Sequence, residues 1–311
     1  MSTLTVTPAL QKIADFGALR RCAQSLGPRR VAVVEADDEV ALTAADCALQ
    51  MRIAVPVLIG NEPRIRAHIE ALRLSGLGAG AEFAGAEHAA TAAVGMARAG
   101  GADVLLKGHL RTDELLRAVL DKQVGLRTGR LLSDVLLYEE LAGEPRLVGI
   151  TDGGLNVLPD LEQKKQIVQN AIEVMRCLGL KRPKIAIMSA TEAVSESVPS
   201  TVDARLLTAM GEAGEFGEAE VLGPLALDCA LSKSAAQAKG ISHPVAGHVD
   251  CMVVPNIEAG NLLGKSVKYL GGSQCAHVVV GAKVPILIPS RVESVDDKVN
   301  SIALGVIFAA R

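Results

Sequence analysis

The sequence predicts an α/β protein with mainly parallel sheets, on the basis of its composition and the rhythm of its apolar segments. Hydrophobic residues make up 49% of the 311 residues and aromatic residues only 2%, so the apolar content is mostly Ala, Val, Leu and Ile. Small branched side chains pack well in parallel strands that helices cover on both faces. Short apolar runs alternate with longer stretches of helical spacing, which is typical of strand–helix–strand units.

The first series of elements lies in the N-terminal part of the chain. Short buried strands are predicted at residues 30–35 (RVAVVE), 55–59 and 102–106 (ADVLL), and an Ala-rich helix at residues 89–99. Because strands and helices alternate, these segments are expected to build one parallel sheet.

A second series begins with a strand at residues 147–151 (LVGIT). A helix follows at residues 161–178, where Asp160 is expected to cap the N-terminus, Gln163 to be its reciprocal partner and Gly179 to end the helix. Further elements continue the alternation: a strand at 184–188, a helix capped by Ser200 with Asp203 at its third position, strands at 250–254, 277–280 and 284–289, and a final helix from about Val295.

The length of the chain exceeds one comfortable hydrophobic core, so two domains are expected. The last strand and helix are predicted to return to the first domain, which makes that domain discontinuous. The predicted domains are residues 1–143 with 282–311, and residues 144–281, each a three-layer α/β/α unit.

Composition excludes several classes of protein. The formal net charge is −3, and no cluster of Lys and Arg interleaved with aromatic residues indicates a nucleic-acid binder. The longest apolar runs, such as 284–288 and 306–310, are far shorter than the ~20 residues that a bilayer-spanning helix needs. Residues 1–12 do not resemble a secretory signal, and the six cysteines form no C-x-x-C pair. A cytoplasmic protein with reduced thiols is therefore expected.

Polar segments follow the predicted strands, where ligands bind in parallel α/β sheets. They combine cations, small hydroxyl groups and Gly-rich backbone, so together they predict an anion-binding rim. No nucleotide-binding signature is present. The segments are residues 107–113, 125–130, 151–156, 189–192, 255–261 and 289–293.

These segments also carry a resemblance to a known family, because seven stretches occur in the matching order over residues 100–311. The chain resembles the phosphate acetyltransferase and phosphate butyryltransferase family, and within it the phosphotransacylase-type domain found fused behind enoyl-CoA hydratase modules. The stretches are KGHLRTDELLRAVL (107–120), GLRTGRLLS (125–133), ITDGGLNVLPDLEQKKQIVQNAIE (150–173), SATEAVSESVPSTVDA (189–204), GPLALDCALS (223–232), VPNIEAGNLLGKSVKYL (254–270) and VGAKVPILIPSRVES (280–294).

The resemblance implies a fold of two α/β/α domains similar to isocitrate and isopropylmalate dehydrogenases, with the active site in the cleft between them. It also implies a homodimer or a larger homo-oligomer. The implied reaction is direct: the thiolate of coenzyme A attacks the carbonyl of an acyl phosphate and expels phosphate. Coenzyme A is then a substrate, and no bound cofactor, metal ion or covalent acyl-enzyme is expected.

Three catalytic residues are carried over from the family pattern: Ser290, Arg291 and Asp297. Asp297 matches the proposed general base for the thiol, while Arg291 and Ser290 would stabilise developing negative charge. A structural alternative exists for Asp297, because Ser294 has the sequence context of an N-cap and Asp297 that of its capping-box partner. Asp296 is the neighbour most easily confused with it.

Eight further residues are candidates for substrate binding. The cations among them suit phosphate because an Arg fork meets phosphate oxygens in pairs. Each has a structural alternative, either a solvated helix face or a role in shaping a turn. The candidates are Lys107, Arg117, Arg127, Arg130, Asp152, Asn156, Glu258 and Asn261.

Two positions depart from the family pattern: Asn256 stands where Asp is usual, and Asp134 where His is common. If either position orients phosphate or sets the local charge, substrate range or rate is expected to differ from that of the family. Gly264, where relatives often carry a larger residue, is expected to open the acyl pocket. Acyl chain length, the direction in the cell and the size of the oligomer are not determined by the sequence.

Three other functions compete with this interpretation. Cys275 and His277 share one face of a predicted strand, which would suit a thiol nucleophile. A metal-dependent dehydrogenase would need clustered Asp residues, whereas Asp152, Asp228 and Asp250 are isolated in the sequence. The third is a regulatory domain that senses acyl-CoA or acyl phosphate without turnover.

Overall fold

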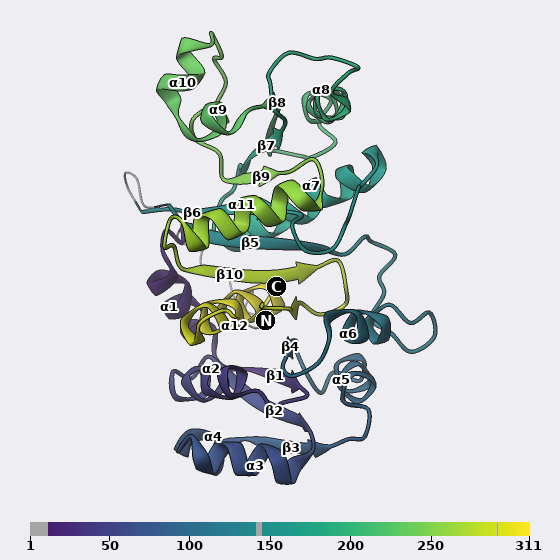
Figure 1. The fold of residues 1–311 in the computed structure, drawn as a ribbon, viewed down its shortest axis with the longest axis vertical. Helices are drawn as coiled ribbons and strands as arrows, with labels where there is room; N and C mark the ends of the chain where they lie inside the picture. The colour runs from purple at the N-terminus through teal and green to yellow at the C-terminus, as the bar shows by residue number, and fades with distance from the viewer. Residues whose placement is uncertain (1–11, 141–144, 291) are drawn as a thin grey trace, which may run out of the picture.

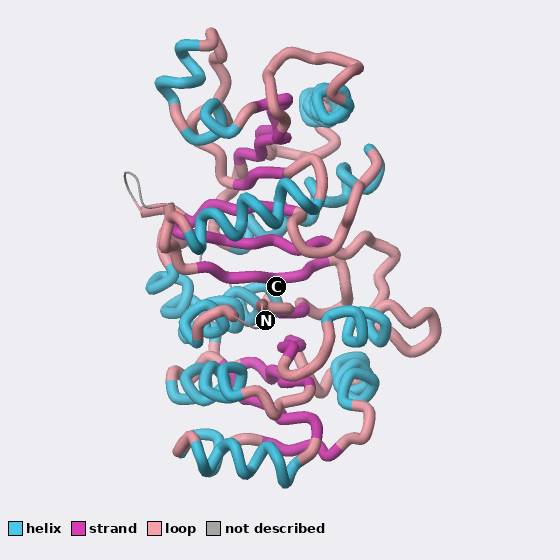
Figure 2. The backbone as a smooth tube through the Cα atoms, viewed as in Figure 1, coloured by secondary structure: helices cyan, strands magenta, loops and turns pink. Residues whose placement is uncertain are grey.

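The computed structural model describes residues 12–140, 145–290 and 292–311. In these ranges one mixed, mostly parallel sheet of eleven strands runs the length of the molecule, from β3 at one end to β8 at the other (Figures 1 and 2). Its strand order is β3-β2-β1-β4-β11-β10-β5-β6-β9-β7-β8. The strands are β1 (Arg29–Val34), β2 (Ala54–Gly60), β3 (Glu82–Gly85), β4 (Val104–Lys107), β5 (Ser133–Glu139), β6 (Leu147–Thr151), β7 (Lys184–Met188), β8 (Glu220–Leu225), β9 (Cys251–Val253), β10 (Cys275–Val280) and β11 (Ile286–Leu287).

Helices cover both faces of this sheet (Figure 1). They are α1 (Phe16–Leu26), α2 (Glu39–Gln50), α3 (Glu62–Ala71), α4 (Ser75–Gly80), α5 (Ala89–Arg98), α6 (Thr112–Val119), α7 (Leu161–Cys177), α8 (Pro199–Glu212), α9 (Leu227–Leu231), α10 (Lys233–Ala238), α11 (Ile257–Tyr269) and α12 (Val295–Ala309).

Two strands at the centre reverse the direction of the sheet. β10 is antiparallel to both β11 and β5, and β5 is antiparallel to β6. The β4 half and the β9 half therefore run in opposite directions, and their carboxyl ends lie at opposite edges. The single rim expected from the sequence is wrong, because the antiparallel strands at the centre place the carboxyl ends of the two halves at opposite edges.

On one face of the sheet, the helices leave a gap above β5 and β10. On the opposite face a continuous apolar core joins β5 and β10 to residues of α1, α2, α7 and α12. On the face with the gap, one core lies under α5 and α6, and a separate core lies under α9, α10 and α11. The boundary between these two cores falls over β5 and β10.

The local signals in the sequence have a mixed outcome. Helix α7 has the expected capping box between Asp160 and Gln163, and Gly179 follows it with φ +83°, which confirms that prediction. The predicted cap at Ser200 is wrong: α8 begins at Pro199, and Ser200 lies inside the first turn. Proline is favoured at this first position because a backbone N–H there would have no partner within the helix, so its absence costs nothing.

The last helix, α12, is almost entirely buried and packs against α1, α2 and β10. A helix that other parts of the protein enclose on every side is expected to be apolar all round. Its N-terminal turn nevertheless carries Ser294, Asp297 and Lys298, of which Asp297 and Lys298 are buried. Buried charges need partners, and these partners define the candidate site.

Candidate active site

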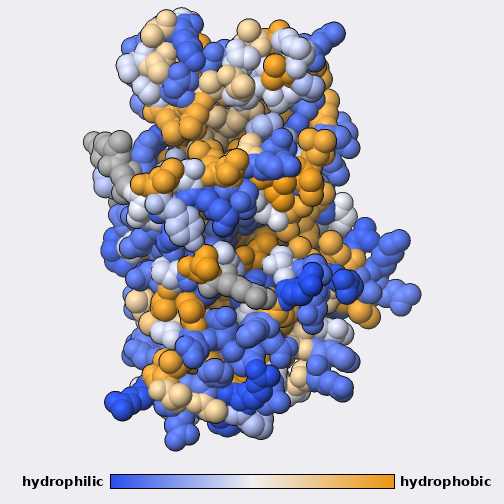
Figure 3. Space-filling view, viewed as in Figure 1, coloured by the Kyte–Doolittle hydropathy of each residue, from blue (hydrophilic) through white to orange (hydrophobic). Residues whose placement is uncertain are grey.

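A cavity of about 220 Å³ occupies the gap above β5 and β10. Leu136, Ile150 and Ile288 give it an apolar portion, while α11 and the start of α6 contribute polar walls. Figure 3 shows hydrophobic surface between hydrophilic side chains in the middle of this face, between the positions of α11 and α6 in Figure 1. The cavity therefore offers both an apolar and a charged environment.

Glycines allow the wall of the cavity to form. A Cβ on Gly260 in α11 would lie 2.7 Å from the Cα of Gly153, so neither position accommodates a side chain without movement. A Cβ on Gly154 would lie 2.9 Å from a carboxylate oxygen of Asp134. The loop after β6 can thus lie directly against both α11 and the start of β5, which all meet at one edge of the sheet.

His277 lies in the cavity between two acidic side chains. Its Nδ1 is 3.1 Å from Oδ2 of Asp134 on β5, and its Nε2 is 3.4 Å from Oε1 of Glu293. Burial lowers the pKa of His277, but the charge and hydrogen bond of Asp134, followed by the charges of Glu293 and Asp297, raise it to about 9. The ring is therefore an imidazolium at neutral pH.

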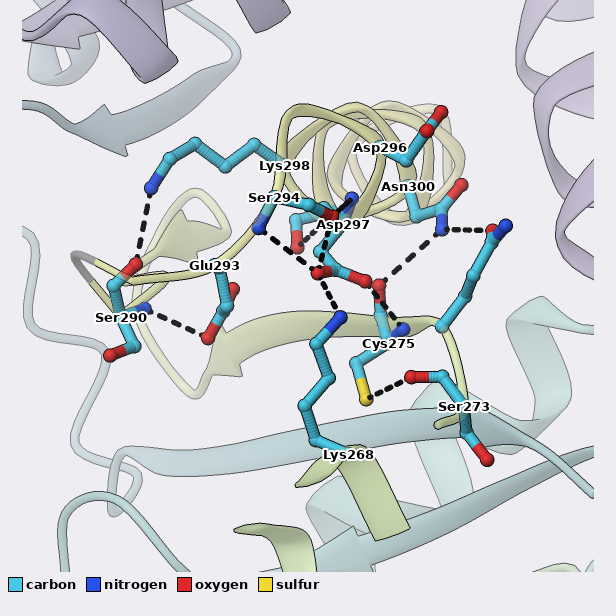
Figure 4. A network of polar contacts seen from close by, with 12 residues as sticks. Lys268, Ser273, Cys275, Ser290, Glu293, Ser294, Asp296, Asp297, Lys298 and Asn300 are labelled. Carbon is cyan, nitrogen blue, oxygen red and sulfur yellow. Dashed lines mark hydrogen bonds and ion pairs between the residues drawn. The ribbon is translucent and has the colours of Figure 1, made fainter. Parts of the chain in front are cut away.

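The segment before α12 is held by two buried charged residues (Figure 4). The backbone N–H of Ser290 donates to Oε1 of Glu293 at 2.8 Å, and Lys298 Nζ donates to the carbonyl of Ser290 at 3.2 Å. Oε2 of Glu293 is buried and has no hydrogen-bond partner among the described residues. Burial lowers the pKa of Lys298, although Asp38, Glu293 and Asp297 oppose this effect.

Asp297 is fully buried and accepts hydrogen bonds on both oxygens (Figure 4). Oδ1 accepts from the N–H of Cys275 at 2.8 Å, while Oδ2 accepts from the hydroxyl of Ser294 at 2.6 Å and from Lys268. Burial raises its pKa, but Lys268, Ser294 and the Cys275 amide together outweigh burial and lower it. Asp297 thus has the capping role considered above, and it also pairs with Lys268, which lines the cavity.

Cys275 lines the same cavity but does not have the properties of a nucleophile. Burial, aided by the charge of Asp297, raises the pKa of its thiol to about 12, and its Sγ is 3.7 Å from the carbonyl of Ser273. A nucleophilic cysteine requires a depressed pKa. Burial of the Cys275 thiol therefore disfavours the acyl-enzyme alternative.

The predicted catalytic residues are only partly described. Ser290 lines the cavity and also a neighbouring hollow that contains Lys107 and Thr112. Lys107 is buried at the end of β4 and lines the same hollow as Ser290. Asp297 does not line the cavity itself but accepts a hydrogen bond from Lys268, which does. Arg291 lies outside the described residues.

A separate groove contains three of the predicted substrate-binding residues: Arg127, Arg130 and Asn156. Leu155 and Asn156 line this groove, whereas Gly153 and Gly154 line the cavity, so one loop borders both. Arg127 is exposed, and Arg130 pairs with Glu173 at 2.7 Å. Asn156 donates to the carbonyl of Leu132 at 2.8 Å and to Asp152, which is the turn-shaping role considered from the sequence.

The remaining candidates are spread out. Asp152 is buried and accepts hydrogen bonds from the N–H groups of Gly154 and Leu155. Burial, with the charge of Asp134, raises the pKa of Asp152 to about 6.

Asn261 lines the cavity, and its Nδ2 is 3.4 Å from the carbonyl of Gly153. Glu258 is exposed in the first turn of α11, and Arg117 is exposed near Asp113.

The departure at Asn256 has a local structural role. Its side chain accepts from the N–H of Ala259 at 2.9 Å and caps α11. Asn and Asp are about equally good at this position, so the substitution preserves the cap while removing a charge.

One acidic cluster lies away from the cavity. Glu192, Asp228 and Cys229 bring potential ligand atoms within 4.8 Å of one another. Lys239 Nζ lies 3.0 Å from a carboxylate oxygen of Glu192 and 3.0 Å from one of Asp228. The ammonium group of Lys239 therefore already neutralises the carboxylates of Glu192 and Asp228, as a bound metal ion would.

The sequence did not bring together one group of charged side chains in and beside the cavity, which is His277, Asp134, Glu293, Lys268 and Lys298. His277 and Asp134 were noticed separately, one as a strand neighbour of Cys275 and one as a departure from the family pattern. Their pairing depends on the antiparallel register of β10 and β5, in which His277 lies opposite Leu136. Neighbouring positions across such a pair put side chains on one face, but the pairing itself could not be read from spacing.

Comparisons with known proteins agree on one family. The family described as "Phosphate acetyl/butaryl transferase" matches residues 79–306. A phosphate acetyltransferase of Rhizobium meliloti is 39% identical over 96% of this chain and 94% of its own length. A phosphate butyryltransferase of Clostridium beijerinckii is 36% identical over 96% of this chain and 98% of its own. The crystal structure of a branched-chain phosphotransacylase from Enterococcus faecalis superposes with a TM-score of 0.77 and 30% identity, over 90% of this chain and 99% of that one.

Proposed function

Because the chain belongs to the phosphate acetyl/butaryl transferase family, we propose that it exchanges a short acyl group between coenzyme A and inorganic phosphate. The chain is thus a transferase. The observation that carries the proposal in this molecule is the cavity above β5 and β10, where an apolar floor meets fixed cations and a serine. Such a site suits an acyl group on one side and a phosphate on the other.

The proposed chemistry is a direct displacement. Fixed positive charge from Lys268, with Lys265 beside it, stabilises phosphate and the oxyanion that forms on the carbonyl. The hydroxyl of Ser290 is proposed to donate a hydrogen bond, and Arg291 to add a second cation. Asp297 is proposed to act on the cavity through Lys268, whose ammonium group it holds in place. No resident cofactor or metal ion is part of this proposal.

The groove beside the cavity is proposed to receive part of coenzyme A. It has leucine side chains, which suit an aliphatic arm, and Arg127 at its exposed side, which suits a phosphate. Because one loop borders both the groove and the cavity, a molecule lying in the groove could reach the cavity with its thiol end. Lys107 is proposed to contribute to phosphate binding from the other side of Ser290.

The finer architecture is also a proposal. Residues 1–143 with 282–311 would form one α/β/α domain and residues 144–281 the other, as in isocitrate dehydrogenase-like folds. The separation of the two apolar cores on the cavity face supports this division. A homodimer in the cytoplasm is proposed as well. Leu262 and Tyr269 of α11, with Leu270 directly after it, supply exposed apolar area for such an interface.

Within the described residues, every helix falls short of the length or the apolar character that a bilayer-spanning helix requires. The regulatory-sensor alternative gains no support from the comparisons, since the relatives named above carry the names of enzymes.

A phosphate-dependent assay of coenzyme A release from acetyl-, propionyl- and butyryl-CoA tests the function. The purified protein is expected to release coenzyme A only when phosphate is present, and Arg291→Ala is expected to lower the turnover rate strongly. Failure to phosphorolyse any short thioester would refute the function. Binding of thioester without turnover would instead favour the sensor.

A further inference from the structure

The proposed reaction has a proton to move. When the hydrogen phosphate dianion attacks a thioester, the phosphate gives up one proton overall and the departing sulfur of coenzyme A gains one. A free thiol has a pKa near 8.5, so a thiolate leaves more easily when an acid is placed beside it. Asp297 is a poor source of that proton because its pKa is lowered and its oxygens already accept hydrogen bonds from Lys268, Ser294 and Cys275.

His277 is placed to supply it. Asp134 binds Nδ1 at 3.1 Å and so fixes the orientation of the ring, while the ring lines the cavity. The distance of 3.4 Å from Nε2 to Glu293 exceeds the 2.7–3.2 Å of a good N–H···O hydrogen bond. Nε2 is thus the ring atom whose proton is not committed to a strong hydrogen bond with Glu293.

The charges around His277 come from each element packed against it. Asp134 lies on β5. Glu293 lies before α12 and Asp297 lies within it. Lys265 and Lys268 line the cavity from α11. Asp297 is already paired with Lys268, so the imidazole responds mainly to Asp134 and Glu293. This arrangement keeps the ring protonated at neutral pH.

We propose that His277, oriented by Asp134, is the acid–base residue that carries the proton between phosphate and the sulfur of coenzyme A; the inference rests on the proposed acyl exchange. In phosphorolysis, a phosphate oxygen forms a bond to the acyl carbon and the C–S bond breaks, with its electron pair remaining on sulfur. The proton on Nε2 passes to that sulfur. The proton of the attacking hydrogen phosphate then returns to Nε2, and the enzyme is restored.

Asp134 is a positioning residue in this scheme. It does not exchange a proton with the substrate, but it holds Nδ1 and stabilises the charged ring, as a carboxylate does for a catalytic histidine in other enzymes. Glu293 gives further stabilisation and holds the N–H of Ser290 with the same oxygen. One cluster thus joins the proton carrier to the proposed hydrogen-bond donor of the site.

The first experiment measures phosphorolysis of butyryl-CoA by His277→Gln and His277→Ala, with His248→Ala as the matched control. His248 is exposed and lies in the loop before β9. Loss of a positioned acid costs about 100-fold or more in kcat, and added imidazole is expected to restore part of the activity of His277→Ala. The control keeps the wild-type rate. Full activity in His277→Gln overturns the inference, as does a loss in His277→Ala that imidazole does not reverse while circular dichroism shows a native fold.

The second experiment uses the pH profile, which a merely structural role for Asp134 would not move. The wild-type kcat is expected to fall as the pH rises through about 9, where the imidazolium loses its proton. In Asp134→Asn the ring loses its main stabilising charge, so this alkaline limb is expected to shift down by about one pH unit or more. An unshifted limb overturns the inference. Wild-type protein that is inactive with every thioester refutes the proposed function instead, so the two failures are distinguishable.

Discussion

The cavity above β5 and β10 and the groove beside it carry charges of different kinds. Asp134 lines the cavity, and Asp297 and Lys298 lie buried beside it. Asp297 accepts a hydrogen bond from the N–H of Cys275, Lys298 donates one to the carbonyl of Ser290, and Asp134 pairs with His277. In the groove, Arg127 is exposed and Arg130 forms an ion pair that solvent reaches. Charges at low exposure act strongly because water does not screen them, whereas exposed pairs contribute little.

From this contrast we propose that the two regions divide the work of an acyl transferase. The cavity has preorganised groups that suit a change of charge during the reaction, which affects kcat. The groove has adaptable surface groups that suit uniform binding of a large substrate, which affects KM.

The largest expected effect is that of Asp297→Asn. The change leaves Lys268 without its buried partner and weakens the cap of α12, so the free energy of unfolding should fall by about 3 kcal/mol. The turnover rate should also fall by about 100-fold, because Lys268 is no longer held in place. Urea denaturation and the phosphorolysis assay measure the two effects.

The matched control is Asp296→Asn at the neighbouring position. Asp296 is largely exposed and pairs with Arg20 at 2.8 Å, so its loss should change stability by about 1 kcal/mol or less. Equal and small effects in both variants would contradict the account of the buried network.

The second prediction concerns the pH dependence of stability. The pKa of His277 is about 9 in the folded protein, above the value of ~6.5 expected in the unfolded chain. Its contribution is therefore fully present below pH ~6.5 and is lost as the pH rises through about 9, with a total of up to ~3 kcal/mol. Urea denaturation across this window should show a steeper decline for the wild type than for His277→Gln. Parallel curves would argue that the ring is not held as a cation.

The third prediction concerns acyl length. A Cβ at Gly264 would lie 3.1 Å from Cδ1 of Leu136 in the apolar part of the cavity. Gly264→Val should therefore reduce kcat/KM for butyryl-CoA relative to acetyl-CoA by about tenfold. Gly95→Ala is a suitable control, because a Cβ at Gly95 in α5 meets nothing within 4 Å. An unchanged preference would place the acyl chain elsewhere.

The smallest expected effect is in the groove. Arg127→Ala should raise KM for the acyl-CoA severalfold and leave kcat within about twofold, because an exposed contact is made equally in the ground and transition states. Arg205→Ala, at an exposed ion pair on α8, serves as the control and should change neither constant. A large loss of kcat in Arg127→Ala would show that the groove takes part in the chemical step.

The sequence predicted the local elements better than their arrangement. The strands β6 and β7 lie where the apolar runs indicated, and Asp160 caps α7 as its spacing predicted. Such signals depend on residues a few positions apart, which is why they can be read from one chain. β5 was not predicted as a strand, although residues 133–139 are almost wholly buried. Without it, the reversal of direction at the centre of the sheet could not be foreseen.

The candidate site shows the same limit. Catalytic roles for Ser290 and Asp297 were predicted from the family pattern and stay predictions. The capping alternative for Asp297, predicted from its spacing to Ser294, is confirmed. The ion pair with Lys268 joins α11 to α12 across 29 residues, and that of His277 with Asp134 joins β10 to β5 across 143 residues. Pairings of this kind depend on strand register and helix packing, which no local pattern encodes.

Acyl exchange is proposed to take place in the cavity, at Ser290. The kcat of Ser290→Ala at saturating butyryl-CoA and phosphate measures whether this hydroxyl takes part. Loss of one preorganised donor should lower kcat by about 100- to 1,000-fold with little change in KM for either substrate. A variant whose kcat stays within twofold of the wild type would contradict the claim.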